Sequence, residues 1–139
     1  MIGLVIAAHG SLPLALNEST QMILGDLEQS ALVTLMPGDS LEGLIERLKA
    51  EVERVNTGDG VLILLDLFGG TPANASAFLT QTMDKVRAVT GVNFPMIAEV
   101  FIARQSTDDV DELAETAFTA GQAGIVNVVE SFKKFRTNP

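Results

Sequence analysis

Three short, mainly apolar runs constrain the fold of this chain more than any other feature. They cover residues 2–8, 31–36 and 61–67, and each is followed within two residues by a glycine or a proline. Runs of this length, rich in isoleucine, valine, leucine and alanine, are typical of strands that are buried on both faces of a parallel sheet. The runs therefore predict three neighbouring buried strands.

Helical patterns separate these runs. The clearest predicted helix opens at Ser40, and its apolar residues recur on one stripe: Leu41, Leu44, Ile45, Leu48 and Val52. Four further helices are predicted, over residues 14–24, 73–83, 93–104 and 108–121. Two further strands are predicted, a half-exposed one over residues 85–90 and a last one over Ile125–Val129. This alternation favours a doubly wound α/β fold, with a mainly parallel sheet flanked by helices on both faces.

Length and composition favour one globular unit. At 139 residues, of which 47% are hydrophobic, the chain can bury a real core, and we expect residues 1–139 to form a single domain. There is no cysteine for disulfides, and the apolar start lacks the basic region of a signal peptide. No apolar segment reaches the length of a membrane span. We therefore expect a cytoplasmic protein.

Charge and residue types exclude several function classes. A formal net charge of −9 disfavours nucleic acid and anionic membranes as partners, because their phosphates would be repelled. One histidine without any cysteine disfavours a zinc site. Neither a Walker A motif nor a G-x-G-x-x-G motif is present. We expect no metal and no cofactor.

Two loops are the candidates for a ligand site on such a sheet. Ligands bind beyond the carboxyl ends of the strands, at the point where the strand order reverses. If the order begins 2-1-3, the loop at residues 8–11 lies beside the loop at residues 66–72. The first loop contains His9, the only histidine. A histidine at a strand end can simply be satisfied by a backbone carbonyl, but this position favours a nucleophile, since neutral imidazole attacks phosphorus without a separate base.

The second loop supplies candidate partners for His9. Asp66 either accepts a hydrogen bond from the protonated ring nitrogen of His9, which fixes the tautomer, or caps the following helix, and both roles can hold. Gly69 and Gly70 let backbone amides approach an anion at a helix N-terminus, and Thr71 can donate its hydroxyl to a phosphoryl oxygen. Ser11 is a further candidate for binding the phosphoryl group. A hydrolase in which Ser11 is the nucleophile is not supported, because the G-x-S-x-G motif is absent.

Three stretches of the sequence resemble the signature motifs of one family. AAHGSLP at residues 7–13, LLDLFGGTPANAS at 64–76 and TGVNFPM at 90–96 are closely similar to those of mannose-family EIIA components of the sugar phosphotransferase system (PTS). The resemblance implies a sheet in the order 2-1-3-4. It also implies an antiparallel strand near the C-terminus, here Ile125–Val129, that is exchanged across a homodimer.

The resemblance also implies a phosphotransferase function. The protein HPr would phosphorylate His9, and His9 would pass the group to EIIB, while the membrane components EIIC and EIID take part only indirectly. Asp66 matches the carboxylate partner of the histidine, Thr71 matches the phosphoryl-contacting Ser or Thr, and Gly70 falls in the surrounding loop. No EIIB domain follows in the 139 residues, so we expect EIIB to be a separate chain. The alternative is a regulatory phosphohistidine module, as in dihydroxyacetone kinase systems or transcription regulators.

Overall fold

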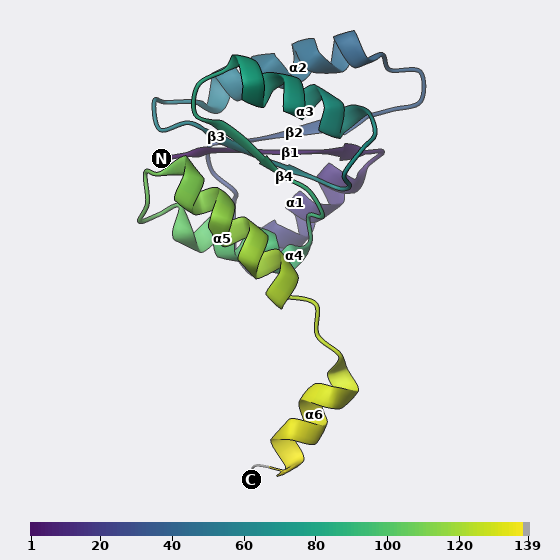
Figure 1. Cartoon of the computed structure of the whole chain (residues 1–139), viewed down its shortest axis with the longest axis vertical. Coiled ribbons are helices and arrows are strands. Elements are labelled where there is room, and N and C mark those ends of the chain that lie inside the picture. The colour runs from purple at the N-terminus through teal and green to yellow at the C-terminus, as the bar shows by residue number, and fades with distance from the viewer. Residues whose placement is uncertain (138–139) are drawn as a thin grey trace.

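Four parallel strands form the central sheet of the computed structural model, which describes residues 1–137 (Figure 1). The strands are β1 (Gly3–His9), β2 (Ser30–Leu35), β3 (Val61–Leu65) and β4 (Val86–Val89). Their order is β2-β1-β3-β4, and every neighbouring pair is parallel. The predicted α/β class and the predicted order 2-1-3-4 are confirmed.

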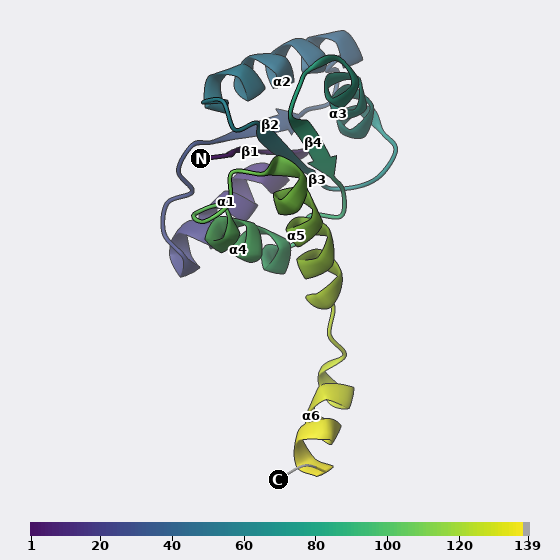
Figure 2. The ribbon, with the colours of Figure 1, turned by 60° about the vertical axis from the view of Figure 1, so that its left-hand side comes forward.

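Helices cover both faces of the sheet (Figures 1 and 2). One face carries α2 (Leu41–Val55) and α3 (Thr71–Thr82), and the other carries α1 (Leu12–Ile23), α4 (Phe94–Ala103) and α5 (Val110–Ala123). A last helix, α6 (Val128–Thr137), extends away from this body. Among residues 1–137, no helix is long and apolar enough to cross a membrane.

The apolar runs are continuous because both faces of the central strands are buried. Successive side chains of a strand point to opposite faces. In β1, Val5 and Ala7 belong to the core beneath α2 and α3, whereas Leu4 and Ile6 belong to the core beneath α4 and α5. All five residues of β3 are buried in the same way. Neither strand has a solvent face that would need polar residues.

The strand that the sequence predicted at Ile125–Val129 is absent from the chain. Residues 125–127 are irregular, and α6 begins at Val128. Asn127 starts this helix, because its side-chain oxygen accepts a hydrogen bond from the Glu130 N–H at 3.2 Å. A strand needs a neighbouring backbone to pair with its N–H and C=O groups, and the chain leads this segment away from the sheet instead. Its exchange across a dimer remains a prediction.

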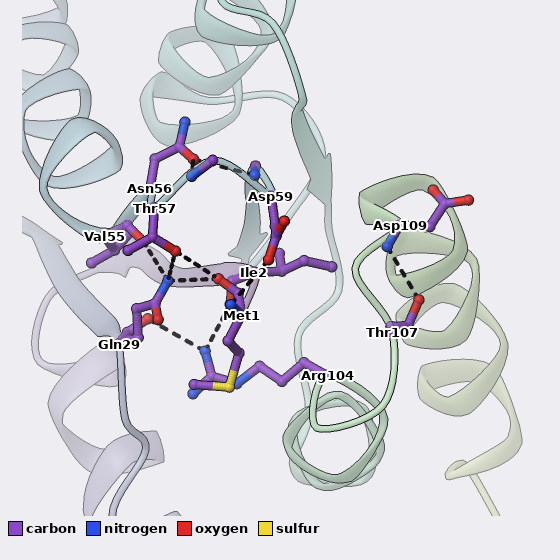
Figure 3. Close-up of polar contacts among 12 residues, drawn as sticks. Met1, Ile2, Gln29, Val55, Asn56, Thr57, Asp59, Arg104, Thr107 and Asp109 are labelled. Carbon is purple, nitrogen blue, oxygen red and sulfur yellow. Dashed lines mark hydrogen bonds and ion pairs between the residues drawn. The ribbon is translucent and has the colours of Figure 1, made fainter.

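A buried arginine joins the segments at the amino end of the sheet (Figure 3). Arg104, which follows α4 and is 2% exposed, donates to the carbonyl oxygens of Ile2 at 3.1 Å and Gln29 at 3.3 Å, and also to that of Glu28. Burial lowers the pKa of Arg104, although an arginine stays charged in proteins. Gln29, whose φ of 49° is unusual for a non-glycine residue, donates in turn to the Met1 and Val55 carbonyls. Arg104 thus links the end of α4 to the residues that directly precede β1 and β2.

Replacement of Arg104 by methionine should destabilise the protein. The carbonyl groups of Ile2, Glu28 and Gln29 would lose their shared donor in a buried place, which should lower the free energy of unfolding by about 2–4 kcal/mol. Urea denaturation followed by circular dichroism measures this change. Arg87→Met is the matched control, because it removes an exposed pair with Asp111 and one hydrogen bond to the Val86 carbonyl, and it should cost about 1 kcal/mol. Equal losses in the two variants would contradict the role given to Arg104.

Candidate functional site

His9 and Asp66 meet at the carboxyl ends of the two central strands. His9 is the last residue of β1, and Asp66 follows β3 directly. The parallel pairing of these strands, with Ala7 opposite Leu65, brings the two residues together although 57 positions separate them in the sequence. The distance between Nδ1 of His9 and Oδ2 of Asp66 is 2.8 Å. The two residues are therefore in contact, as the strand order predicted.

The carboxylate of Asp66 is held by N–H groups from both loops. Its Oδ2 accepts from the backbone N–H of His9 at 3.1 Å, and its Oδ1 accepts from that of Leu67 at 3.0 Å. The residue at the N-cap of α3 is Gly70, so the alternative in which Asp66 caps that helix is wrong. The Asp66 carboxylate instead forms hydrogen bonds with His9 and with the backbone of its own loop.

Burial and hydrogen bonding act on Asp66 in opposite directions. Burial raises the pKa of Asp66, but the hydrogen bonds from the His9 backbone and ring, together with the charge of a protonated ring, lower it more. The net effect is a pKa below the ordinary carboxyl value of 3.8. Asp66 is thus ionised at neutral pH and can only accept a hydrogen bond.

This hydrogen bond determines which ring nitrogen is available for chemistry. Because ionised Asp66 can only accept, the proton of a neutral His9 ring lies on Nδ1 and the lone pair lies on Nε2. The His9 side chain is 46% exposed, whereas that of Asp66 is 13% exposed. A half-buried carboxylate therefore orients an accessible ring, whose Nε2 can act as a nucleophile.

The loop that precedes α3 lies against the reactive side of the ring. A Cβ atom placed on Gly70 would lie 3.6 Å from Cε1 and 3.9 Å from Nε2 of His9. Gly69 and Gly70 have φ values of 79° and 87°, which glycine adopts without strain. The helix begins at Thr71, so the N–H groups of its first turn and the positive end of its dipole are at this place. Such an arrangement suits an anion beside Nε2.

Ser11 and Thr71 both lie at helix starts. Ser11 is exposed and occupies the N-cap position of α1, where its side chain makes no capping hydrogen bond. Thr71 is the first residue of α3, directly after Gly70. Both residues follow strands that end at the same edge as His9, and their contact with a phosphoryl group stays a prediction. Within residues 1–137, no group of three or more His, Asp or Glu side chains could hold a metal ion.

Exposed apolar side chains near His9 are the feature that the sequence interpretation missed. Phe68 is 89% exposed, and Leu12, Met36 and Leu67 are also exposed. They belong to the segments that follow β1, β2 and β3, at the same edge of the sheet as His9. The signal was present, because Leu67 and Phe68 continue an apolar run beyond the acidic Asp66 where a strand would already have ended. We call these four residues the apolar collar.

Comparison with known proteins identifies the family. A family model described as the PTS system fructose IIA component (EIIA-man) matches residues 3–118. The chain belongs to the mannose family of PTS EIIA components. Members of this family are phosphotransferases in general, and names of relatives include mannose-, fructose- and sorbose-specific components.

Curated relatives of this EIIA chain cover most of its length. It is 34% identical over 111 residues to the mannose-specific EIIAB component of Escherichia coli K12, which covers 80% of the chain but only 34% of that protein. It is also 34% identical over 105 residues to the fructose-specific EIIA component of Bacillus subtilis, with 76% and 72% of the two chains covered. The EIIA chain thus spans about a third of the length of the EIIAB relative.

Solved structures share the EIIA fold. The EIIA component from Streptococcus agalactiae superposes with a TM-score of 0.86 at 30% identity, covering 94% of this chain and 99% of that chain. The mannose/sorbose-specific IIA subunit from Enterococcus faecalis gives a TM-score of 0.83 at 31% identity, covering 91% and 94%. A sigma-54 interaction domain protein from Enterococcus faecalis, at 16% identity and a TM-score of 0.72, shares the fold alone.

The lowered pKa of Asp66 predicts how the stability of this EIIA component depends on pH. A carboxyl whose pKa is lower in the folded state stabilises the fold above its unfolded pKa, and this contribution disappears as the pH falls through the lowered folded value. The wild type should therefore unfold less readily than Asp66→Asn at neutral pH, and the difference should shrink below the ordinary pKa of 3.8. Urea denaturation at a series of pH values from about 7 to about 2.5 measures it.

Asp108→Asn is the control for this titration, because Asp108 is an exposed carboxylate in the loop before α5. This substitution should change the stability by less than about 0.5 kcal/mol at neutral pH. A stability difference between wild type and Asp66→Asn that stays constant down to the lowest pH would contradict the assignment.

Proposed function

We propose that His9 accepts a phosphoryl group from phosphorylated HPr and passes it to an EIIB domain. The single observation that carries this proposal is the hydrogen bond between His9 Nδ1 and Asp66, which leaves Nε2 accessible beside the N-terminus of α3. Membership of a phosphotransferase family supports the same reaction. The relay that we propose operates in the cytoplasm, and it reaches the membrane components EIIC and EIID only through EIIB.

The transfer needs no cofactor in this scheme. The lone pair of His9 Nε2 attacks the phosphorus of the donor phosphohistidine, and an N–P bond forms. The N–P bond of the donor breaks, and its electron pair returns to the donor imidazole. His9 keeps its proton on Nδ1 and becomes a positively charged phosphoimidazole. The second step repeats this exchange with EIIB as the acceptor, so His9 recovers its lone pair.

Asp66 stabilises the phosphorylated ring in this scheme. The positive charge that develops on the imidazole lies 2.8 Å from a carboxylate oxygen, so their attraction grows as the bond to phosphorus forms. The carboxylate also holds the ring in one tautomer and one orientation before the reaction. Because Asp66 is already ordered by backbone N–H groups, little reorganisation is required during the transfer.

The phosphoryl oxygens are assigned to the start of α3. Backbone N–H groups after Gly70 and the dipole of α3 attract the negative oxygens, and the Thr71 hydroxyl donates to one of them. Ser11, whose hydroxyl is not used to cap α1, is a second donor candidate from the opposite loop. Phosphoryl transfer depends mainly on positioning and on charge stabilisation, which a site of few residues can supply.

The apolar collar supports proteins rather than small molecules as partners. Exposed side chains such as Phe68 and Met36 around a reactive group favour a protein surface that can cover them. HPr and EIIB would use this surface in turn, since both must bring a histidine or another acceptor to the same Nε2. A regulatory module would carry the same phosphohistidine without the second transfer.

Incubation with phosphoenolpyruvate, enzyme I and HPr tests the first transfer. The wild type should acquire one phosphoryl group, and His9→Ala should acquire none. Asp66→Asn should be phosphorylated more slowly by a factor on the order of 10²–10⁴, because an amide can hold the ring in the wrong tautomer. Rates are measured with radiolabelled phosphoenolpyruvate. Asp108→Asn, which lies in the loop before α5, should react like the wild type.

Three outcomes of this assay are distinguished. Label that remains in His9→Ala, or that never enters the wild type, would overturn the proposal. Transfer of the label from phosphorylated wild type to a mannose-type EIIB supports the transport relay. Label that enters His9 but passes to no mannose-type EIIB favours the regulatory module.

The position of the phosphoryl group gives an independent test. Because Asp66 occupies Nδ1, phosphorylation should occur at Nε2 of His9. Long-range nitrogen–proton NMR correlations distinguish the two phosphoimidazoles, and the chain contains only one histidine to assign. A phosphoryl group on Nδ1 would mean that the hydrogen bond to Asp66 breaks before the transfer.

A further inference from the structure

The loop after β2 lies next to the reactive histidine but carries none of the reacting groups. Leu35, the last residue of β2, pairs with His9 in the sheet, and its carbonyl oxygen accepts a hydrogen bond from the Gly10 N–H at 2.8 Å. Met36, the next residue, belongs to the apolar collar and is 51% exposed. The loop therefore brings an apolar side chain to the edge of the sheet at which His9 reacts.

A tight turn fixes the backbone around Met36. Residues 36–39 read Met-Pro-Gly-Asp, and Gly38 has a φ of 91°. Proline at the second position and glycine with a positive φ at the third are typical of a type II turn. The Asp39 N–H donates to the Met36 carbonyl oxygen at 3.1 Å, and the Met36 N–H donates to Oδ2 of Asp39 at 2.8 Å. Both backbone polar groups of Met36 are thus bound within the turn.

Arg47 of α2 attaches this turn to the end of β2. Its Nη2 donates to the Thr34 carbonyl oxygen at 2.8 Å and to Oδ2 of Asp39 at 3.2 Å. The carboxylate oxygen that accepts the Met36 N–H is therefore also bound by Arg47. Hydrogen bonds that involve a charged group are stronger than neutral ones. Arg47 and Asp39 thus hold the turn in one place relative to the strand.

We propose that Arg47 and Asp39 are positioning residues for phosphoryl transfer, because they hold Met36 where phosphorylated HPr docks. This inference rests on the relay proposed above. HPr would cover Met36 with an apolar recess next to its phosphoryl group. A side chain on an ordered backbone loses less conformational entropy on binding, so the fixed turn lowers the concentration of HPr that is required. Methionine suits this role, since its flexible thioether adapts to the surface that covers it.

Arg54 provides a matched control on the same helix. Its Nη2 donates to the Ser30 carbonyl oxygen at 3.1 Å, and its guanidinium pairs with Glu51. Arg47 and Arg54 thus make the same kind of contact between α2 and β2, near opposite ends of the strand. Replacing either residue with methionine keeps an apolar stem and removes one positive charge. A merely structural role of Arg47 would make the two variants behave alike.

The kinetics of transfer from phosphorylated HPr test the inference. Arg47→Met should raise the KM for phosphorylated HPr by about fivefold and leave kcat within about twofold of the wild type, because His9 and Asp66 are unchanged. Arg47→Lys should recover most of this loss, since an ammonium group also has enough donors for both oxygens. Arg54→Met should leave both constants unchanged. Equal KM increases in the two methionine variants would overturn the inference.

A double-mutant cycle tests whether Arg47 acts through Met36. Met36→Ala should itself raise the KM for phosphorylated HPr by roughly tenfold. If Arg47 only holds Met36 in place, adding Arg47→Met to Met36→Ala should raise the KM no further. Independent effects would instead multiply to about fiftyfold. Such multiplication would overturn the positioning role.

Amide hydrogen exchange at Met36 tests the turn without any partner. Asp39→Ala removes the acceptor of the Met36 N–H, so this amide should exchange about tenfold faster than in the wild type. Arg47→Met should also accelerate the exchange, and Arg54→Met should not. Unchanged exchange in Asp39→Ala would mean that the carboxylate does not hold the turn, and would overturn the inference.

The transfer assay separates a failure of this inference from a failure of the relay. A wild type that takes up no phosphoryl group from phosphorylated HPr would overturn the relay and the positioning role together. A wild type that is phosphorylated on His9, with a KM that Arg47→Met does not change, would overturn the positioning role alone.

Discussion

The parallel pairing of β1 with β3 is the constraint on which the rest of this structure depends. It buries both faces of two apolar segments that lie more than fifty residues apart, and it leaves their carboxyl ends side by side. The same register that packs Val5 and Ile63 into one core also brings His9 to Asp66. The position of the reactive ring is therefore a direct consequence of core packing. A shift of this register by one residue would move every buried side chain to the other face, so the site geometry is protected by the energy of the core.

The half-buried carboxylate of Asp66 lies in an acidic chain, and groups of the site itself stabilise its charge. Burial alone would favour the protonated form of Asp66, but two backbone N–H groups and the His9 ring reverse the effect. The carboxylate is therefore charged before any phosphoryl group arrives. The nearby helix start provides the opposite polarity for the phosphoryl oxygens. In this way, negative and positive electrostatic features lie on two sides of one imidazole, as a ring that becomes positive while it binds an anion requires.

Much of this arrangement is predictable from the sequence, because strands that are buried on both faces have a simple signature. The three apolar runs, together with the helical patterns between them, predicted the class, and the switch-point rule placed His9 near Asp66. The role of Asp66 stayed open between a cap and a histidine partner, since both require the same residue type at a strand end. The N-cap of α3 is Gly70, so Asp66 does not cap that helix, and its carboxylate contacts the His9 ring. The strand predicted at Ile125–Val129 does not form within the single chain for a different reason: strand formation depends on a neighbouring backbone, and Asn127 instead caps a helix.

The amino end of the sheet contributes mainly to stability, whereas the carboxyl end carries the reactive histidine. At the amino end, Arg104 and Gln29 satisfy carbonyl groups of several segments, so the loops there are held by buried hydrogen bonds. At the carboxyl end, the loops have positive-φ glycines and an exposed Phe68, features that add little to stability. Such loops are useful where another protein must approach His9 closely, because they leave N–H groups and apolar side chains accessible. The exposed loops can contribute little to stability without unfolding the site, because the strands that carry them are held by the core and by the hydrogen bonds at the amino end.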